Sequence, residues 1–285
     1  KYQSLNLKIR YKRNINDIGS DRNVAQCFNM AKGKYVHIFC DDDIYYKNTL
    51  PEVLNEISKK NYGSIFLRPY GFYENHEDEY PLNLSGKNVS LGAEDFLLKI
   101  TTQITLASAH IINKSLIKDI DANKYCGTNL VQVNLILDAI TRSKSCFYFK
   151  KYIIAIQKNN SGGYDLYDVF VNNFSSILQS YVDKKLITSQ LKKKIECKNI
   201  KCFFPSYIFR SMFYLKENMS NIETKFKILH KYKCYKFFIR PIFRLPYTFA
   251  LIWCFFITIY GRLINGDIAL LLTFAKNIKK ERIFK

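Results

Sequence analysis

The sequence predicts an α/β fold in which a mostly parallel, Rossmann-like sheet is flanked by helices and followed by a helical, basic C-terminal region. Three observations predict it. Strand-like and helix-like segments alternate through the first half, one apolar run ends in three consecutive aspartates, and positive charge is concentrated in the last third. With 285 residues, 48% of them hydrophobic, the chain can bury a sizeable core. This composition excludes collagen-like, low-complexity and wholly disordered proteins.

The alternation begins at residues 6–11, where polar and apolar residues alternate as in a half-buried strand. A helix is expected from Asp21, because apolar residues recur at helical spacing until Gly33 can end it. Residues 34–40 are almost all β-branched or aromatic, which is typical of a strand buried on both faces of a parallel sheet. This strand leads directly into Asp41-Asp42-Asp43.

The pattern continues with a helix over residues 48–59 and a strand over residues 64–67. A helix beginning at Ala93 carries Glu94 and Asp95 in its first turn, where acids complement the helix dipole. A strand over 107–112 and a helix over 129–140 follow. Ligands of such sheets bind beyond the carboxyl ends of the strands, and the three aspartates lie at one such end.

Charge divides the chain in two. Up to Asp183 there are 22 basic and 19 acidic residues, whereas the remainder has 22 basic and 5 acidic. We therefore expect a near-neutral globular domain over residues 1–183 and a basic, aromatic-rich region over residues 184–285. The net charge of +20 indicates a partner such as a phosphate-bearing substrate, nucleic acid or an anionic membrane.

The eight cysteines show neither a CxxC pair nor a metal-ligand spacing, and most follow apolar or aromatic residues. We expect them to be small buried hydrophobes in a reducing cytosol. The chain begins at Lys1 without an apolar signal region, so no secretory signal is expected. His37 lies within an apolar strand and is expected to be a core histidine, and His76 and His110 have no second ligand at metal spacing.

Three consecutive carboxylates repel one another unless a cation or hydrogen-bond donors compensate. Carboxylate oxygens are hard ligands, and Mg²⁺ or Mn²⁺ commonly binds a nucleotide diphosphate through one or two of them. The triplet therefore indicates a metal and nucleotide site. The alternative is a solvated acidic turn in which Asp43 caps the next helix.

A wider pattern surrounds the triplet. Its residues are Gly19, Arg22-Asn23, Ala31-Lys32-Gly33-Lys34-Tyr35, Asp41-Asp42-Asp43, Leu50 and Leu54. Together they resemble the catalytic domain of glycosyltransferase family 2, which has the GT-A fold. Residues 109–114 and 125–132 resemble the abequosyltransferase-like bacterial enzymes of lipopolysaccharide O-antigen assembly. The resemblance covers residues 6–175.

The resemblance implies a nucleotide-diphosphate-sugar donor and a Mn²⁺ or Mg²⁺ cofactor. It makes Asp43 the catalytic metal ligand, with Asp41 as a second ligand that also contacts the nucleotide ribose, and it places Asp42 in the same donor site. Arg22 would lie near the nucleotide, and Asn23 would support the same loop. Residues 158–164 resemble a loop that closes over the donor, where Lys158 would counter the leaving diphosphate; an ordinary turn is the alternative.

Two departures from the family pattern concern the nucleotide-sugar donor site and the general base. The first strand of the family, and the aspartate that contacts the nucleobase, would precede Lys1. This strand is therefore missing from the sequence. The region that carries the general base in many inverting members offers Thr128, Asn129 and Gln132, none of which is a base near neutral pH. Asp138 is expected to lie at the surface or along a helix. The base stays unassigned, with the acidic loop 74–79 as a possible source.

The basic region contains 17 consecutive residues without a charge, Leu245 to Gly261, and a second apolar stretch over 268–275. The first barely reaches the length of a membrane-spanning helix. We therefore expect an apolar hairpin over residues 245–275 that lies in the membrane interface, with residues 232–285 on the membrane surface. A buried helical hairpin that packs on the catalytic domain is the alternative.

These observations predict a metal-dependent, inverting glycosyltransferase at the cytoplasmic face of the bacterial inner membrane. It would transfer a sugar from a nucleotide-diphosphate-sugar to a surface polysaccharide or a lipid-linked oligosaccharide. Two other classes stay open: a non-catalytic family relative that serves as a scaffold, and a nucleic-acid-binding protein that uses the basic tail. Nucleic-acid binding would not explain the uncharged run from Leu245 to Gly261, so no nucleic-acid partner is expected.

Overall fold

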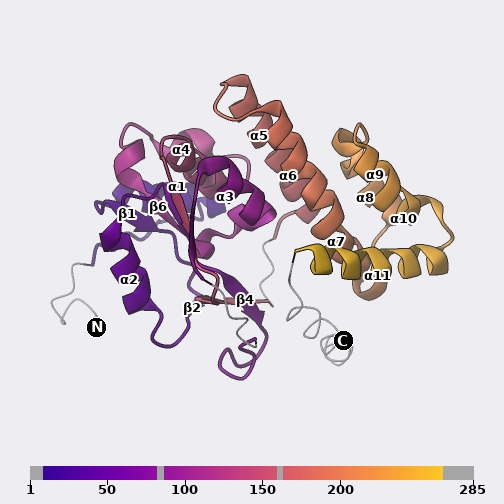
Figure 1. The fold of residues 1–285 in the computed structure, drawn as a ribbon, viewed down its shortest axis with the longest axis horizontal. Helices are drawn as coiled ribbons and strands as arrows, with labels where there is room; N and C mark the ends of the chain where they lie inside the picture. The colour runs from indigo at the N-terminus through magenta and orange to yellow at the C-terminus, as the bar shows by residue number, and fades with distance from the viewer. Residues whose placement is uncertain (1–8, 82–86, 159–162, 266–285) are drawn as a thin grey trace.

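The computed structural model describes residues 9–81, 87–158 and 163–265. It confirms the α/β class: Figure 1 shows a body of strands and helices beside a group of C-terminal helices. The strands are β1 (Tyr35–His37), β2 (Ile44–Tyr45), β3 (Ser64–Phe66), β4 (Pro69–Phe72), β5 (Val89–Leu91), β6 (His110–Asn113), β7 (Cys146–Tyr148) and β8 (Ile154–Gln157).

Helices account for the rest of the regular structure. The α-helices are α1 (Gly19–Met30), α2 (Leu50–Lys59), α3 (Ala93–Ile100), α4 (Val131–Thr141), α5 (Phe174–Asp183), α6 (Ser189–Cys202), α7 (Phe204–Arg210), α8 (Met219–Lys225), α9 (Lys233–Phe238), α10 (Arg240–Arg244) and α11 (Tyr247–Ile264). Short 3₁₀ turns are η2 (Thr101–Thr105), η3 (Ala107–Ala109), η4 (Lys114–Ile117), η5 (Ala122–Tyr125) and η8 (Lys227–Leu229), and π-helical turns are η6 (Asp168–Asn173) and η7 (Ser211–Leu215).

The main sheet has the strand order β1-β6-β3-β7-β5, and a smaller sheet has the order β2-β8-β4. The main sheet is mixed, which corrects the expectation of mostly parallel pairing. Strands β1 and β3 run in the same direction, but β6 lies between them and pairs antiparallel with both. Strand β7 is parallel to β3, and β5 is antiparallel to β7. The alternation of strands and helices had predicted parallel pairing, but this alternation carries no information about the insertion of β6 between β1 and β3.

The prediction of a strand at residues 6–11 is wrong for residues 9–11, the part that the structure describes. Residues 9–11 are exposed and have no regular structure, so alternating polarity there does not reflect a half-buried face. Residues 6–8 lie outside the described residues. The strand expected at residues 107–112 begins at His110, because residues 107–109 form the turn η3. The first-turn position of Glu94 and Asp95 in α3 is confirmed.

The two faces of the main sheet are covered by different helices. Phe66 and Ile112 point into the core formed with α1, α3 and α4. Ile65 and Ile111, each one residue earlier, point into a second cluster that includes Val53 of α2. Because successive residues of a strand face opposite sides, this alternation fixes both the register and the two helical layers.

Helix α6 joins the C-terminal helices to the sheet domain. Its Leu191 and Ile195 belong to the same hydrophobic core as the sheet, although they follow the change in charge at Asp183. Further along the helix, the Thr102 hydroxyl donates to Asn199 Oδ1 at 3.2 Å. Beyond this contact a separate aromatic core holds α7 to α11 together. The packing is therefore continuous from the sheet to the last described helix.

A buried ion pair lies within this junction. Lys192 Nζ lies 2.6 Å from Glu196 Oε1 on the next turn of α6, and both side chains are at most 5% exposed. The Ser175 hydroxyl of α5 donates to the same oxygen at 2.5 Å, and the Tyr232 hydroxyl donates to Oε2 of Glu196. Glu196 thus ties α5, α6 and the segment before α9 together through charge-assisted hydrogen bonds.

We expect Lys192→Met to lower the free energy of unfolding by about 3–5 kcal/mol, because it leaves the Glu196 carboxylate buried without a cation. Lys193→Met is the matched control, because Lys193 is the exposed neighbour of Lys192 on α6 and its substitution makes the same chemical change at the surface. Urea-induced unfolding followed by circular dichroism measures both. Equal midpoints for the two variants would contradict this interpretation.

His110 makes the domain sensitive to acid. Its side chain is completely buried, with Nε2 donating to the Gln103 carbonyl at 3.2 Å and Nδ1 lying 3.3 Å from the Ser64 hydroxyl. Burial lowers the pKa of His110 from 6.5 to about 3, while the Gln103 carbonyl acts in the opposite direction. Below about pH 6.5 the unfolded chain therefore binds a proton at His110, whereas the folded chain does not.

Stability should consequently fall as the pH is lowered from about 6.5 towards 3, with a slope contributed by His110 of at most ~1.4 kcal/mol per pH unit. The variant His110→Gln keeps an amide donor but does not titrate, so its unfolding free energy should depend less on pH. Unfolding midpoints measured between pH 7.5 and 5 test this. The same pH dependence in both proteins would show that His110 is not the responsible group.

Candidate active site

The aspartate triplet forms a tight turn immediately after β1. The Asp43 backbone N–H donates to the Cys40 carbonyl at 3.4 Å, which closes the turn. One ligand atom each from Cys40, Asp42 and Asp43 lies within 4.8 Å of the others. Asp41 is exposed and is not part of this group. The turn thus gathers two carboxylates and a thiol at the sheet edge where the sequence predicted a ligand site.

Cys40 was expected to be a buried hydrophobe, and this is wrong. Its side chain is exposed, because the strand ends at His37 and the chain has left the sheet before residue 40. Among the described cysteines, Cys146 and Cys254 are the buried ones. Cys40 is therefore a feature of the candidate site that sequence reasoning missed.

Ser108 holds the turn against the main sheet. Its hydroxyl oxygen accepts a hydrogen bond from the Cys40 backbone N–H at 2.9 Å. Its carbonyl lies 2.8 Å from His37 Nε2, which must therefore carry the proton, and the Tyr45 hydroxyl can donate to His37 Nδ1 at 2.9 Å. Both ring nitrogens of His37 are satisfied inside the protein, which confirms its expected role as a core histidine. Ser108 lay in an expected strand and carried no signal in the sequence.

The smaller sheet brings a second set of residues to the turn. Strand β8 is antiparallel to β2 and parallel to β4, so the ends of β8 and β4 lie beside the start of β2. The Gln157 backbone N–H at the end of β8 donates to Asp43 Oδ1 at 3.3 Å. The Gln157 side-chain amide donates to the carbonyl of Tyr73, which follows β4, at 3.1 Å. Asp43 is thus held from both sheets.

The surroundings of Asp43 raise its pKa above that of an ordinary aspartate. The main cause is burial, and the neighbouring Asp42 and Asp41 carboxylates act in the same direction. The Ser108 hydroxyl and the Gln157 backbone N–H lower it by hydrogen bonding to the carboxylate. A bound cation would compensate the charge that burial and the neighbouring aspartates disfavour.

Lys158 lies at this same edge, directly after β8. Its ammonium group is 4.6 Å from the centre of the Tyr73 ring, a cation–π contact. Its aliphatic part runs over Gly71, where an added Cβ would come within 2.2 Å of Lys158 Cε. Tyr73 and Gly71 therefore fix the position of Lys158 beside the turn. Residues 159–162 of the expected closing loop lie outside the described residues.

Arg22 and Asn23 are exposed on α1. Arg22 lines a groove of about 750 Å³ together with Gln26, Asn123 and Cys126. The three aspartates do not line this groove. The structure therefore places Arg22 between α1 and η5, and it does not bring Arg22 into the cluster around Asp43.

Asp21, beside them, has a structural role that the sequence did not reveal. Its Oδ2 accepts hydrogen bonds from three successive backbone N–H groups, those of Gly127, Thr128 and Asn129, at 2.6, 2.9 and 2.9 Å. Gly127 and Asn129 have positive φ angles of 103° and 55°, which turn the three donors towards one oxygen. Asp21 thus fixes the loop before α4 onto α1. The sequence pattern had placed Asp21 only at the start of an expected helix.

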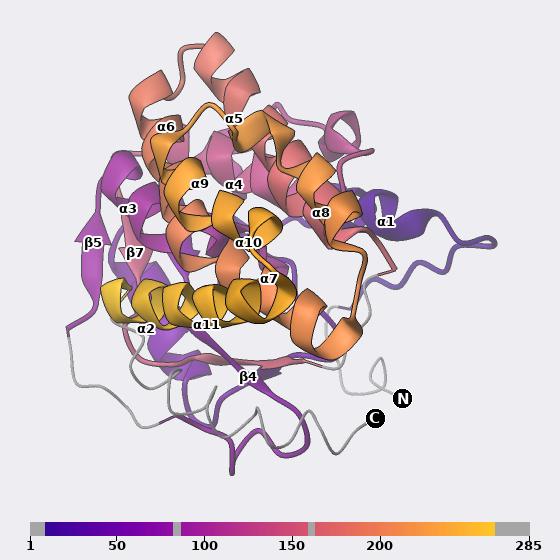
Figure 2. The ribbon, with the colours of Figure 1, turned by 90° about the vertical axis from the view of Figure 1, so that its right-hand side faces the viewer.

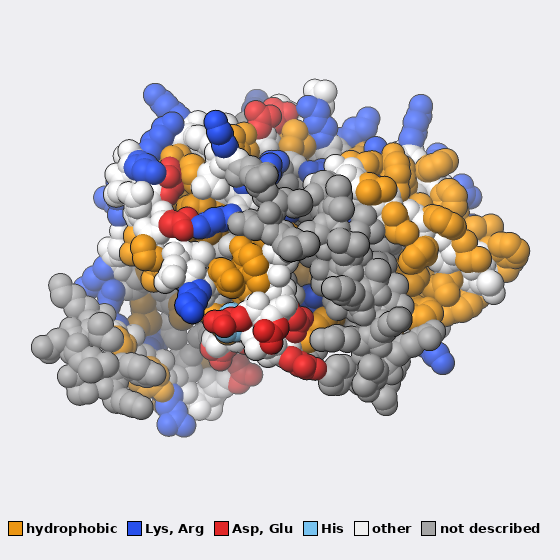
Figure 3. Space-filling view, turned by 60° about the horizontal axis from the view of Figure 1, so that its bottom comes forward, with side chains coloured by type: hydrophobic (Ala, Val, Ile, Leu, Met, Phe, Trp, Pro, Cys, Tyr) orange, Lys and Arg blue, Asp and Glu red, His pale blue; other side chains and the backbone are white. Residues whose placement is uncertain are grey.

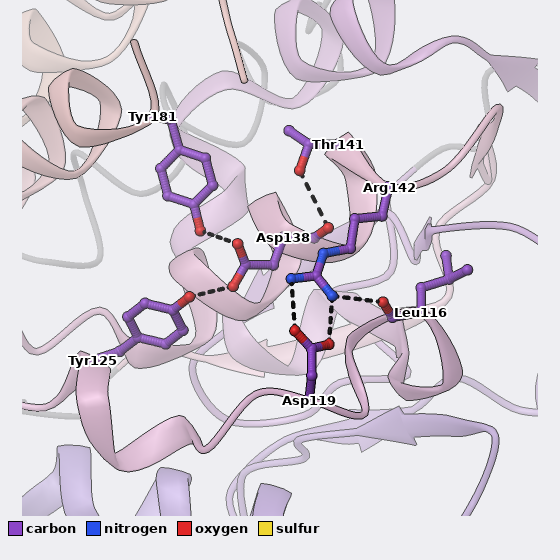
Figure 4. A network of polar contacts seen from close by, with 7 residues as sticks. All are labelled: Leu116, Asp119, Tyr125, Asp138, Thr141, Arg142 and Tyr181. Carbon is purple, nitrogen blue, oxygen red and sulfur yellow. Dashed lines mark hydrogen bonds and ion pairs between the residues drawn. The ribbon is translucent and has the colours of Figure 1, made fainter. Parts of the chain in front are cut away.

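Asp138 lies on α4, which agrees with one of the two expected placements, but it is buried and does not lie at the surface. Figure 4 shows its carboxylate between two tyrosines: the Tyr181 hydroxyl donates to Oδ1 at 2.8 Å, and the Tyr125 hydroxyl donates to Oδ2. Beside it, Arg142 forms a two-pronged ion pair with Asp119. Asp138 therefore anchors α4 to α5 and is not accessible to an acceptor.

The acidic loop 74–79 follows β4 at the edge that carries Asp43. Glu79 accepts hydrogen bonds from the backbone N–H groups of Tyr73 and Glu74, both at 3.0 Å, so it shapes the loop. Asp78 accepts from the Asn75 side chain at 2.9 Å. Glu74 and Glu77 are exposed. Their carboxylates are therefore open to solvent, as is that of Asp78.

The donor set at the turn fits a divalent cation. Two aspartates offer hard oxygen ligands within reach of one another, and the partly exposed turn leaves room for phosphate oxygens and water. Within the part of the chain that the structure describes, this is the one group of at least three acidic, His or Cys side chains with such proximity. The Cys40 thiol would add a softer ligand, which Mn²⁺ accepts more readily than Mg²⁺.

Comparisons with known proteins agree with this geometry. Residues 1–121 match the family model described as glycosyl transferase family 2. No curated protein sequence gives a match. The S. aureus protein TarS, residues 1–349, has a similar fold, with 13% sequence identity, a TM-score of 0.50 and coverage of 88% of this chain and 70% of that one. A second TarS structure, in complex with UDP-GlcNAc, has 12% identity and a TM-score of 0.47, with coverage of 87% and 71%.

The family match spans α1, β1, the aspartate turn and Ser108, whereas Gln157 and Lys158 of the candidate site lie beyond the matched residues. The likeness to TarS concerns the fold, in which a mixed sheet is flanked by helices and followed by further helices. We conclude that residues 1–121 are similar to glycosyl transferase family 2 and that the chain has a GT-A-like fold.

Proposed function

We propose that the protein transfers one sugar from a nucleotide-diphosphate-sugar to a surface polysaccharide or a lipid-linked oligosaccharide, with inversion and with a divalent metal. The single observation that supports this most strongly is the cluster of Cys40, Asp42 and Asp43, whose ligand atoms lie within 4.8 Å at the end of β1. The family match over the same segment supports a nucleotide sugar as the donor.

In this proposal Asp43 is the principal ligand of a Mn²⁺ or Mg²⁺ ion, because Ser108 and Gln157 fix its position from two sheets. A second carboxylate comes from the turn: Asp42 lies in the cluster, and the exposed Asp41 is available to the cation and to the nucleotide ribose. A bound cation supplies positive charge that stabilises the departing diphosphate.

Other residues of the proposed donor site have different degrees of support. Lys158 lies on the edge that carries Asp43 and adds a fixed positive charge for the diphosphate. Arg22 and Asn23 contact the nucleotide in the proposal by family resemblance, although Arg22 lines a separate groove. A nucleotide-sugar donor that extends from the aspartate turn to that groove would contact residues of both.

Inversion requires a base that accepts the proton of the acceptor hydroxyl as the sugar is transferred. Asp138 is excluded from this role because it is buried and both of its oxygens accept hydrogen bonds from tyrosines. Glu74 and Glu77 are the candidates, since they are exposed in the loop that follows β4. Their place beside the smaller sheet puts them on the side of the molecule that carries Asp43.

The proposed acceptor and location follow from the family resemblance and from the charge of the C-terminal region. The abequosyltransferase-like subgroup suggests O-antigen assembly at the cytoplasmic face of the bacterial inner membrane. Acceptors there carry a lipid diphosphate, which suits a region with 22 basic and 5 acidic residues after Asp183.

We expect Asp43→Asn to reduce turnover by about 100-fold or more, because it removes a charged ligand without changing the size of the side chain. The assay measures nucleoside diphosphate released from a panel of nucleotide sugars with Mn²⁺ and detergent-solubilised full-length protein. Asp183→Asn, at an exposed position on α5, is the matched control and should retain full activity. Wild-type turnover that is unchanged by Asp43→Asn would refute the assignment of the site.

Ser108→Ala tests the support of the turn. Removing the hydroxyl frees the Cys40 N–H and loosens Asp43, so the Mn²⁺ concentration for half-maximal turnover should rise about 10-fold. At saturating Mn²⁺ the turnover number should stay within a few-fold of wild type. A loss of turnover that Mn²⁺ does not restore would show that Ser108 acts on something other than the metal ligands.

A further inference from the structure

Helix α11 exposes a continuous apolar face. Phe249, Ile252, Phe256, Tyr260 and Leu263 are between 48% and 64% exposed, and their spacing of three and four residues places them on one side of the helix. Figure 3 shows the corresponding concentration of hydrophobic side chains over the C-terminal helices. An exposed helix face without a single charged residue is unusual for a protein surface that contacts only water.

The opposite face of α11 is packed on protein. Ala250, Cys254 and Ile257 belong to the C-terminal core, and Figure 2 shows the helix running across this group of helices. At Gly261 the helix approaches α6 so closely that an added Cβ would lie 2.4 Å from the Lys201 carbonyl oxygen. The helix is therefore held along its length by α6 and α7.

By length and composition alone, α11 is able to cross a membrane: it has 18 residues with a mean hydropathy of 1.6. Its packing favours a different arrangement. Of this window, 28% is buried inside the protein, and the buried side is continuous with the core. A helix with one face on protein and one apolar face exposed suits the plane of a membrane interface better than a span surrounded by lipid. The second arm of the expected hairpin, residues 268–275, lies outside the described residues.

Aromatic residues extend the apolar face onto α9. Phe237 is 60% exposed, and its ring lies 5.7 Å from that of Trp253 on α11. Phe238 stacks on Tyr260, also with 5.7 Å between ring centres. The Trp253 indole N–H donates to the Phe238 carbonyl. Tyrosine, tryptophan and phenylalanine side chains of this kind are typical of the region where lipid headgroups meet acyl chains.

Positive charge borders the apolar face. Lys233, Lys236, Arg240 and Arg244 are exposed on α9 and α10, and α10 packs against α11. No acidic residue occurs in the sequence between Glu223 and Asp267. Arg244 forms an ion pair with Glu223 at 2.7 Å, whereas the charges of Lys233, Lys236 and Arg240 are complementary to anionic lipid. Each such basic residue contributes on the order of 1 kcal/mol near an anionic surface. A second copy of the chain would instead bring like charges together.

We propose that the exposed face of α11, together with Phe237 and the bordering Lys233, Lys236, Arg240 and Arg244, is a docking surface for an anionic lipid bilayer. Helix α11 lies in the plane of the interface, with its aromatic side chains below the headgroups and its basic neighbours among them. This surface acts independently of the donor chemistry at Asp43.

The position of the docking surface has a consequence for the enzyme. In Figure 1 the smaller sheet and α11 both lie along the lower side of the molecule. Figure 3, which brings that side forward, shows acidic side chains and the hydrophobic patch on the same face. Docking through α11 would therefore turn the side that carries the smaller sheet towards the membrane, where a lipid-linked acceptor is found.

The test is flotation of full-length protein with lipid vesicles in a density gradient after removal of detergent. Vesicles of phosphatidylcholine with phosphatidylglycerol should carry most of the protein, and pure phosphatidylcholine vesicles should carry several-fold less. The double variant Phe249→Ser/Phe256→Ser should reduce the bound fraction on anionic vesicles about tenfold. The matched control is Tyr11→Ser/Leu54→Ser, which alters two exposed apolar residues of the sheet domain and should bind like wild type.

A second variant, Lys233→Gln/Lys236→Gln, separates charge from apolar contact. It should weaken binding to anionic vesicles and leave the weak binding to phosphatidylcholine unchanged.

The proposal is overturned if the Phe249/Phe256 variant floats like wild type, or if binding does not depend on phosphatidylglycerol. A concentration-dependent dimer that disappears in the Phe249/Phe256 variant, without any flotation of the wild type, would instead assign the face to a second copy. Nucleotide-sugar turnover, measured in parallel in detergent, should be the same in all variants, so failure of docking is distinguishable from failure of the catalytic assignment.

Discussion

The position of Asp43 is the constraint on which the candidate site depends. Its carboxylate lies after the end of β1 in the main sheet and is bonded to the backbone of Gln157 at the end of β8 in the smaller sheet. Ser108 fixes the same turn from η3, which directly precedes the strand β6 between β1 and β3. A carboxylate that is half-buried beside like charges is unfavourable on its own, and the divalent cation that we propose would compensate its charge.

The second organising element is α6, which connects the sheet domain with the C-terminal helices. Its buried Lys192–Glu196 pair and its contacts with η2 make the two parts one packed body. Because α11 lies on α6 and α7, the apolar face has a fixed position relative to the sheets. The proposed donor site and the proposed docking surface on α11 can therefore keep a constant orientation, as the proposed transfer to a lipid-linked acceptor would require.

Much of the fold follows from local patterns, and the rest depends on long-range contacts. The periodicity of residues 48–59 and 93–100 and the run before Asp41 predicted helices and a strand, because these signals come from neighbours in the sequence. The insertion of β6 between β1 and β3 could not be predicted, since periodicity carries no information about strand order. The roles of Ser108 and Asp21 were hidden for the same reason: each acts through partners about 70 to 110 residues away in the chain.

The central claim is that the turn at Asp41–Asp43 binds a divalent cation together with the diphosphate of the donor. Isothermal titration of the full-length protein with UDP, GDP, CDP and dTDP, each with Mn²⁺ and with EDTA, tests this most directly. We expect one nucleoside diphosphate to bind at least ten-fold more tightly with Mn²⁺, with a reciprocal increase in Mn²⁺ affinity, because two ligands of one site strengthen each other equally. Diphosphate binding that is the same with Mn²⁺ and with EDTA would contradict the claim.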